Sequence, residues 1–117
     1  MNADQLLELL RRITDSDDPV ARERGADEVT DWTCSWSPAE AITLATVLSV
    51  TAACERNHTA LEAQLHALLE LMSTGHVVGE HLYRVREIDL DGLPAELVEY
   101  ITDLKLTSPT PKAATPG

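Results

Sequence analysis

The side chains of this chain that could take part in catalysis or binding are mainly carboxylates, because 20 of its 117 residues are Asp or Glu. Glu87, Asp89 and Asp91 alternate along the chain before Gly92, which matches the start of an oxygen-rich calcium loop. Such a loop needs a bidentate glutamate at its twelfth position, and that position is Val98 here. The spacing therefore predicts a solvated turn leading into a helix, and no calcium site.

Histidines, cysteines and serines do not reach the spacings that metal binding or nucleophilic catalysis needs. Cys54 and His58 are four residues apart, but a helix is expected to end between them, and no second ligand pair follows. Ser35 and Ser37 lie near Cys34 without a histidine or aspartate at an interpretable distance, and no glycine-rich phosphate loop is present. Both cysteines fall in apolar helical segments, which predicts reduced, buried thiols. We therefore expect no metal, no cofactor and no enzymatic activity.

The charge balance limits the classes of partner. Nine Lys and Arg residues against 20 acidic ones give a net charge of −11, distributed as −5, −3 and −3 over residues 1–36, 37–76 and 77–117. Nucleic acid and anionic membranes would be repelled by such a surface, whereas a basic protein would be attracted. The alternative is that the charge only keeps the protein soluble. The longest uncharged run, 41–54, is too short to span a bilayer, so we expect a cytoplasmic protein.

The elements that must position these side chains are helices. Hydrophobic residues make up 44% of the chain while aromatic residues make up only 3%, which favours helices with aliphatic cores over a β-sandwich. Asp18-Pro19 and the capping box from Ser37 to Glu40 mark the starts of helices over 19–33 and 38–54. The 38–54 helix is apolar almost all round and is expected to be the most buried element.

Four further helices complete the prediction. A leucine-rich amphipathic stretch begins the chain, and Thr59 with Glu62 predicts a capping box for a fourth helix that ends near Gly75. A weakly marked fifth helix is expected over 77–87, and a sixth begins at Leu93-Pro94. We therefore predict an all-α domain of about six helices over residues 1–106, in three antiparallel hairpins. A disordered tail is predicted over 107–117.

The second helices of the three hairpins begin near Pro19, His58 and Pro94, at intervals of 39 and 36 residues. The segment 17–26, Asp-Asp-Pro-Val-Ala-Arg-Glu-Arg-Gly-Ala, resembles the turn within HEAT and HEAT-like repeats, where Asp-Pro leads into a helix opened by Val, Arg and Ala. Ala21 separates the Val from the Arg here, and the later hairpins keep only the helix-turn-helix outline. The resemblance implies a short HEAT-like α-solenoid; the alternative is an irregular six-helix bundle.

Acidic side chains recur at helical spacing on the second helix of each hairpin, which predicts three stripes. In HEAT-type solenoids these helices line the inner binding surface, so the resemblance implies one acidic face; the alternative is three ordinary solvated faces. Trp32 is expected in the core, and Trp36 is the candidate for an exposed anchor, with core packing as its alternative. The predicted partner-binding residues are Glu23, Asp27, Asp31, Trp36, Glu62, His66, Glu70, Glu96, Glu99 and Asp103.

Size, charge and expected fold together resemble the small acidic immunity proteins that bacteria pair with toxins, several of which have helical or HEAT-like folds. The resemblance implies a protein that occludes a basic, nucleic-acid-directed toxin with carboxylates that mimic phosphates. The alternative is a scaffold or adaptor subunit of a larger complex, which predicts an exposed apolar patch. Neither prediction defines the oligomeric state.

Overall fold

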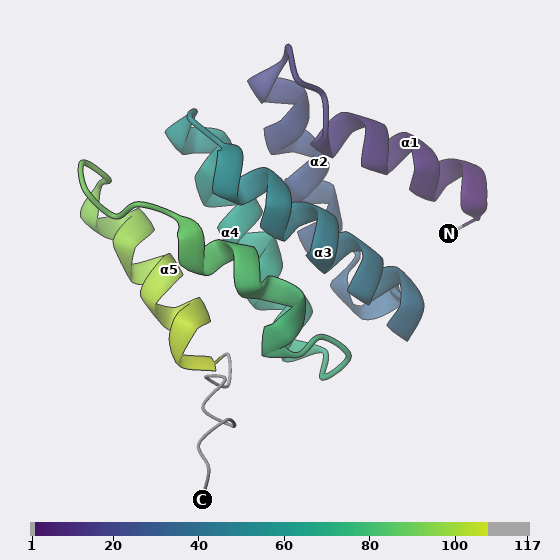
Figure 1. Ribbon diagram of the computed structural model, residues 1–117. Coiled ribbons are helices and arrows are strands. Elements are labelled where there is room, and N and C mark those ends of the chain that lie inside the picture. Colours follow the sequence, from purple (N-terminus) through teal and green to yellow (C-terminus); the bar gives the residue numbers. More distant parts are fainter. Residues whose placement is uncertain (1, 108–117) are drawn as a thin grey trace, which may run out of the picture.

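The computed structural model describes residues 2–107, within which every regular element is a helix (Figure 1). The prediction of an all-α fold is confirmed for this part of the chain. The elements are α1 (Ala3–Ile13), α2 (Pro19–Asp31), the 3₁₀ turn η1 (Thr33–Ser35), α3 (Pro38–Cys54), α4 (His58–Ser73), the 3₁₀ segment η2 (Gly79–Glu87) and α5 (Ala95–Thr107). The predicted tail over 107–117 lies outside the described residues except for Thr107, which ends α5.

The helices pack in two layers (Figure 1). In one layer α3 packs against α1 and η2, and in the other α4 packs against α2 and α5. The pairs α1 with α2, α3 with α4, and η2 with α5 each contact one another across the layers. The three hairpins predicted from the sequence are therefore present and stack in chain order, whereas their membership of a HEAT-like solenoid stays a prediction.

The strongest start signals in the sequence produce the expected caps. The Asp18 carboxylate accepts hydrogen bonds from the N–H groups of Val20 and Ala21, and Pro19, which has no N–H, takes the first helical position. Ser37 Oγ accepts from the Glu40 N–H, and Glu40 Oε1 accepts from the Ser37 N–H in return. Side chains thus satisfy backbone donors that have no partner inside these helices, as the sequence predicts.

Two predicted elements differ from the structure. Helix α4 begins at His58, because the Asn57 side chain caps it by accepting the Ala60 N–H; the capping box predicted from Thr59 is wrong. The segment predicted as a fifth α-helix is instead two short 3₁₀ turns, interrupted at Leu82, where φ is −116° and ψ is 15°. Leu82 is buried, so core packing holds the chain in place at the interruption.

The core consists mainly of leucine and alanine, and its centre is α4. Eight residues of α4 are buried, compared with six in α3, because α4 packs against α2, α3 and α5. The expectation that the 38–54 helix is the most buried element is therefore wrong. Helix α3 also has three neighbours, but they cover only part of its apolar surface, so side chains such as Val50 are exposed to solvent.

The turns within the three hairpins share one hydrogen-bonding device. In each turn a carboxylate accepts the backbone N–H two residues further on, at 2.9 Å for Asp15, 3.1 Å for Glu55 and 3.0 Å for Asp89. Such a bond closes a tight turn before the following helix. The three turns therefore share this hydrogen bond, although they differ in length and their sequences have only the acidic residue in common.

Candidate functional site

The acidic charge of the helices is concentrated in one of the two layers. Helices α2, α4 and α5 each carry a net charge of −2, whereas α1 and η2 are neutral and α3 carries −1. The total charge is a property of the sequence, but its separation between layers depends on the packing. The layer of α2, α4 and α5 is the surface on which a cationic partner would be most strongly attracted.

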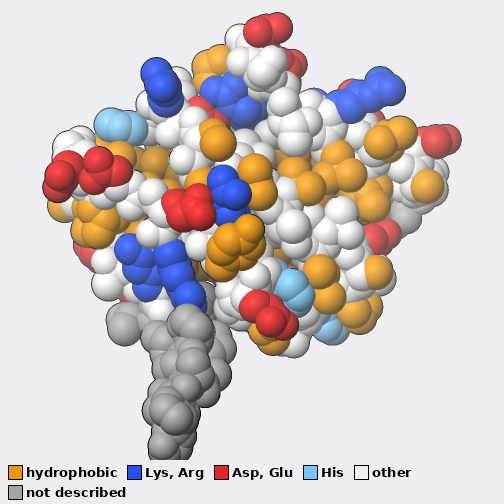
Figure 2. Space-filling model, viewed as in Figure 1, with side chains coloured by type: hydrophobic (Ala, Val, Ile, Leu, Met, Phe, Trp, Pro, Cys, Tyr) orange, Lys and Arg blue, Asp and Glu red, His pale blue; other side chains and the backbone are white. Residues whose placement is uncertain are grey.

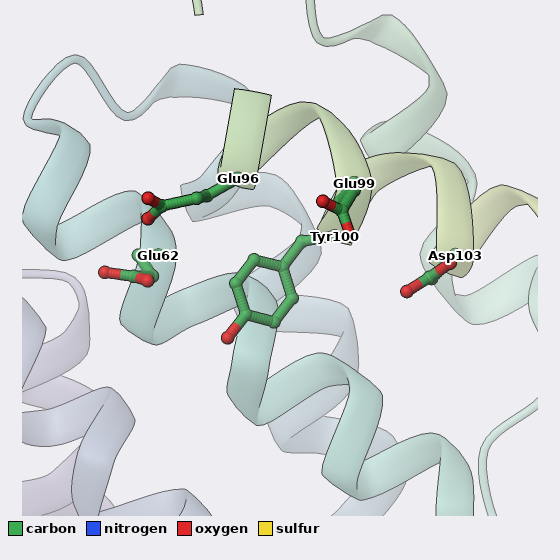
Figure 3. Close-up of a pocket in the computed structure, with 5 residues that line it drawn as sticks. All are labelled: Glu62, Glu96, Glu99, Tyr100 and Asp103. Carbon is green, nitrogen blue, oxygen red and sulfur yellow. The ribbon is translucent and has the colours of Figure 1, made fainter. Parts of the chain in front are cut away.

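Four of the predicted carboxylates surround one groove between α4 and α5 (Figure 3). Glu62 comes from α4, and Glu96, Glu99 and Asp103 come from α5. They line a hollow of about 280 Å³ together with Tyr100. We call this hollow the α4–α5 groove.

Tyr100 places an aromatic ring among these carboxylates, and the sequence analysis did not identify it. Figure 3 shows the ring projecting from α5 between Glu62 and Asp103. The ring lies 6.1 Å, centroid to centroid, from the imidazole of His66 on α4. The sequence signal that could have identified Tyr100 is its position directly after Glu99 on an acidic helix. The arrangement of carboxylates around an aromatic face suits a guanidinium or ammonium group.

His66 and Glu70 extend the acidic surface along α4. His66 Nε2 lies 3.7 Å from Glu70 Oε2, and both side chains are a little under half exposed. His66 therefore connects Glu70 to the groove through its contact with Tyr100. The predicted stripe on α4 is thus continuous with the α4–α5 groove.

The stripe on α2 is not part of the groove. Asp27 and Asp31 are exposed and Glu23 is partly exposed, so all three are accessible, but none of them lines the hollow. The structure therefore brings together the predicted residues of α4 and α5. Those of α2 form a separate stretch of the same layer.

Of the two tryptophans, Trp36 is buried and Trp32 is exposed. Trp36 is only 5% exposed, and its indole Nε1–H donates a hydrogen bond of 3.1 Å to the Val29 carbonyl. Trp32 is 47% exposed. Helix α2 ends at Asp31, and η1 then reverses the chain, which returns Trp36 to the core. Core packing, the alternative given for Trp36, is therefore confirmed, and Trp36 is not an exposed anchor. The expectation that Trp32 packs in the core is wrong, and Trp32 is the accessible tryptophan.

The cysteines are more exposed than the sequence predicts. Cys34 and Cys54 are free thiols but both are exposed, so the prediction that they are buried is wrong. Cys34 lies in the 3₁₀ turn η1, and Cys54 is the last residue of α3. Within residues 2–107, no group of three or more His, Cys, Asp or Glu side chains is placed to hold a metal ion.

A buried ion pair that the sequence analysis missed joins the first two hairpins. Arg22 donates to both carboxylate oxygens of Glu55, at 2.7 and 2.8 Å, and Gln64 Nε2 donates to the same carboxylate at 2.7 Å. Arg22 also donates to the Asp15 carbonyl at 2.7 Å. Burial alone would raise the pKa of Glu55, but the hydrogen bonds from Arg22, Gln64 and the Asn57 N–H outweigh it and lower the pKa below its ordinary value. This pair is structural, because its charges are already satisfied.

Comparison with known proteins yields no matching family model, no similar curated protein and no similar solved structure. Across residues 2–107, no helix combines the length and apolar character needed to cross a membrane.

Proposed function

We propose that this protein is a small protein-binding module that docks its acidic layer onto a basic protein surface. The observation that carries the proposal is the α4–α5 groove, where four carboxylates surround the Tyr100 ring. Three acidic helices side by side also bear like charges that mildly destabilise the isolated domain. A basic partner would neutralise that repulsion and gain association rate from the opposite charge.

The most specific form of the proposal is a neutralising partner similar to small acidic immunity proteins. Carboxylates on α4 and α5 would occupy the positions that phosphates take on a nucleic-acid-directed toxin, so that the toxin's own substrate is excluded. An arginine of the toxin would enter the α4–α5 groove and lie against Tyr100. The stacked hairpins and the hydrogen bond that their turns share support a HEAT-like repeat architecture, which we propose on the same basis.

Two variants with equal charge test the role of the groove. The groove variant carries Glu62→Gln, Glu96→Gln and Glu99→Gln. The control variant removes three carboxylates elsewhere: Asp17→Asn, Glu80→Gln and Asp91→Asn. The control side chains are exposed and cap no helix. Both variants have the same net charge, so any difference in binding between them reports the position of the charges.

The first experiment uses the wild type and both variants as bait in host-cell extract, at low and high salt, with mass spectrometry of the captured proteins. We expect the wild type and the control variant to capture a basic protein at low salt. The groove variant should associate with that protein about tenfold more slowly. Equal association rates for the two variants would contradict the groove as the docking site, and a captured protein without net positive charge would contradict the proposed partner class.

A second candidate function, an adaptor subunit of a larger complex, is favoured by the opposite layer. Val50, Val78 and Tyr83 on or beside α3 and η2 are all exposed. Figure 2 shows hydrophobic side chains across this face of the molecule. An adaptor would bury this layer, and its binding would be insensitive to salt. Capture that persists at high salt and is lost in a Tyr83→Ser variant would support this function over the first.

A further inference from the structure

A second hollow, separate from the α4–α5 groove, lies where the start of α1 meets the end of α2. Its volume is about 420 Å³, and its lining includes Asp4, Glu8 and Arg12 from α1, Glu28 from α2, and Trp32 just after α2. We call it the Trp32 hollow. Nothing in the proposed function uses it, and none of its residues lines the α4–α5 groove.

Trp32 is the feature that marks this hollow as a binding site. Its side chain is 47% exposed, and within the described chain its indole N–H donates no hydrogen bond. Trp36, four residues later, fills the core position, and its indole N–H donates to the Val29 carbonyl. A half-exposed indole beside a concavity leaves both a flat apolar face and an N–H group available to a ligand.

The charges around the indole define which ligand fits. Glu28 is already paired with Arg12 at 2.9 Å. Asp4 and Glu8 are exposed and make no ion pair within residues 2–107, although the charge of Glu8 contributes, after that of Glu28, to raising the pKa of Arg12. Their spacing of four residues places Asp4 and Glu8 on the same side of α1. An anion would be repelled by these two carboxylates, and a neutral apolar ligand would desolvate them without compensation. A cation would be attracted by both, because Arg12, the cation already present in the hollow, is bound directly by Glu28 alone within the described chain.

We propose that the Trp32 hollow binds the guanidinium group of an arginine side chain on a basic polypeptide. The planar guanidinium would stack on the indole face, while its N–H groups donate to Asp4 and Glu8. Arginine fits this combination better than lysine, because the ammonium group is compact, strongly hydrated and unable to stack. The inference is independent of the function proposed for the α4–α5 groove.

The experiment follows the two indole N–H signals by ¹H–¹⁵N NMR during titration with hexa-arginine amide. A Trp32→Phe variant assigns the signals, since it removes the exposed indole and leaves the buried Trp36 in place. We expect the Trp32 signal to shift on titration while the Trp36 signal stays fixed. Hexa-lysine amide, with the same charge, should give a much smaller shift of the Trp32 signal.

Two charge-matched variants locate the site. Asp4→Asn with Glu8→Gln should weaken the hexa-arginine titration of Trp32 by about tenfold, whereas Asp17→Asn with Glu80→Gln should leave it close to the wild type. The groove variant of Glu62, Glu96 and Glu99 should also retain the Trp32 shift, which separates this inference from the proposed function. An unmoved Trp32 signal, equal responses to the two peptides, or equal weakening by the two double variants would each overturn the inference.

Discussion

Replacement of Glu55 with glutamine tests how the first two hairpins are held together. The Glu55 side chain is 1% exposed and that of Arg22 is 16% exposed. Glutamine keeps the shape of the side chain but leaves the Arg22 guanidinium without its counter-charge. It also replaces one acceptor oxygen with an amide NH₂, which would face an N–H donor. Removing one partner of a buried ion pair costs about 3 kcal/mol, and for a domain of this size each kcal/mol lowers Tm by about 4–8 °C. We therefore expect the Tm to fall by roughly 12–24 °C.

The assay is thermal unfolding followed by the helical circular dichroism signal at pH 7. Glu87→Gln is the matched control, because it removes a carboxylate from an exposed ion pair, in which Glu87 lies 2.9 Å from Arg84. That variant should unfold close to the wild-type midpoint, since exposed pairs contribute little. A Glu55→Gln midpoint equal to the control would refute the reasoning, because the apolar contacts between α2 and α4 would then suffice to join the hairpins.

The same pair makes stability depend on pH in a defined direction. The pKa of Glu55 is lowered in the folded protein from its ordinary value of 4.5, so folding favours the ionised carboxylate. The stabilisation is fully present above pH 4.5 and is lost as the pH falls through the lower, folded-state pKa. The Glu55→Gln variant has no ionisable carboxylate at this position. The difference in unfolding free energy between wild type and variant should therefore be constant above pH 5 and should become smaller as the pH falls below 4.5. A difference that stays constant down to the acid unfolding of the wild type would contradict this assignment.

Two further variants test the helix starts and the helix packing. Ser37→Ala removes the hydroxyl that accepts the Glu40 N–H and should lower the unfolding free energy by about 1 kcal/mol; an unchanged urea midpoint would mean that α3 does not depend on this cap. Gly25→Ala places a Cβ 2.6 Å from Ile13 Cγ2, where α1 crosses α2, so overpacking of about 1–3 kcal/mol should outweigh the gain of about 1 kcal/mol in helix propensity. A raised Tm for that variant would show that Ile13 moves aside without cost.

The helix boundaries that could be predicted are those set by local chemistry. Asp18-Pro19 and Ser37-Pro38 define the starts of α2 and α3, because each cap needs only residues within one turn of it. The start of α4 was misassigned, since Asn57 and Thr59 are both acceptable caps by local criteria. The 3₁₀ character of η2 was not predictable, because it depends on the contacts that hold Leu82 in the core.

The acidic site was predicted in part. Helical spacing identified Glu62 on α4 and Glu96, Glu99 and Asp103 on α5, because side chains three or four residues apart share a helix face. Their common groove, and the presence of Tyr100 within it, depends on how α4 and α5 pack. Spacing within one helix contains no information about which face of a neighbouring helix it meets.

The sequence alone determined the helical class and the number of hairpins, since caps, turns and apolar periodicity act over a few residues. Its composition determined the excess of negative charge. The exchange of Trp32 and Trp36 between surface and core came from the chain reversal at η1, which no helical periodicity describes. The Arg22–Glu55 pair likewise formed between residues 33 positions apart, when α2 packed beside α4. Burial and long-range pairing depend on which elements meet, so these features required the packed fold.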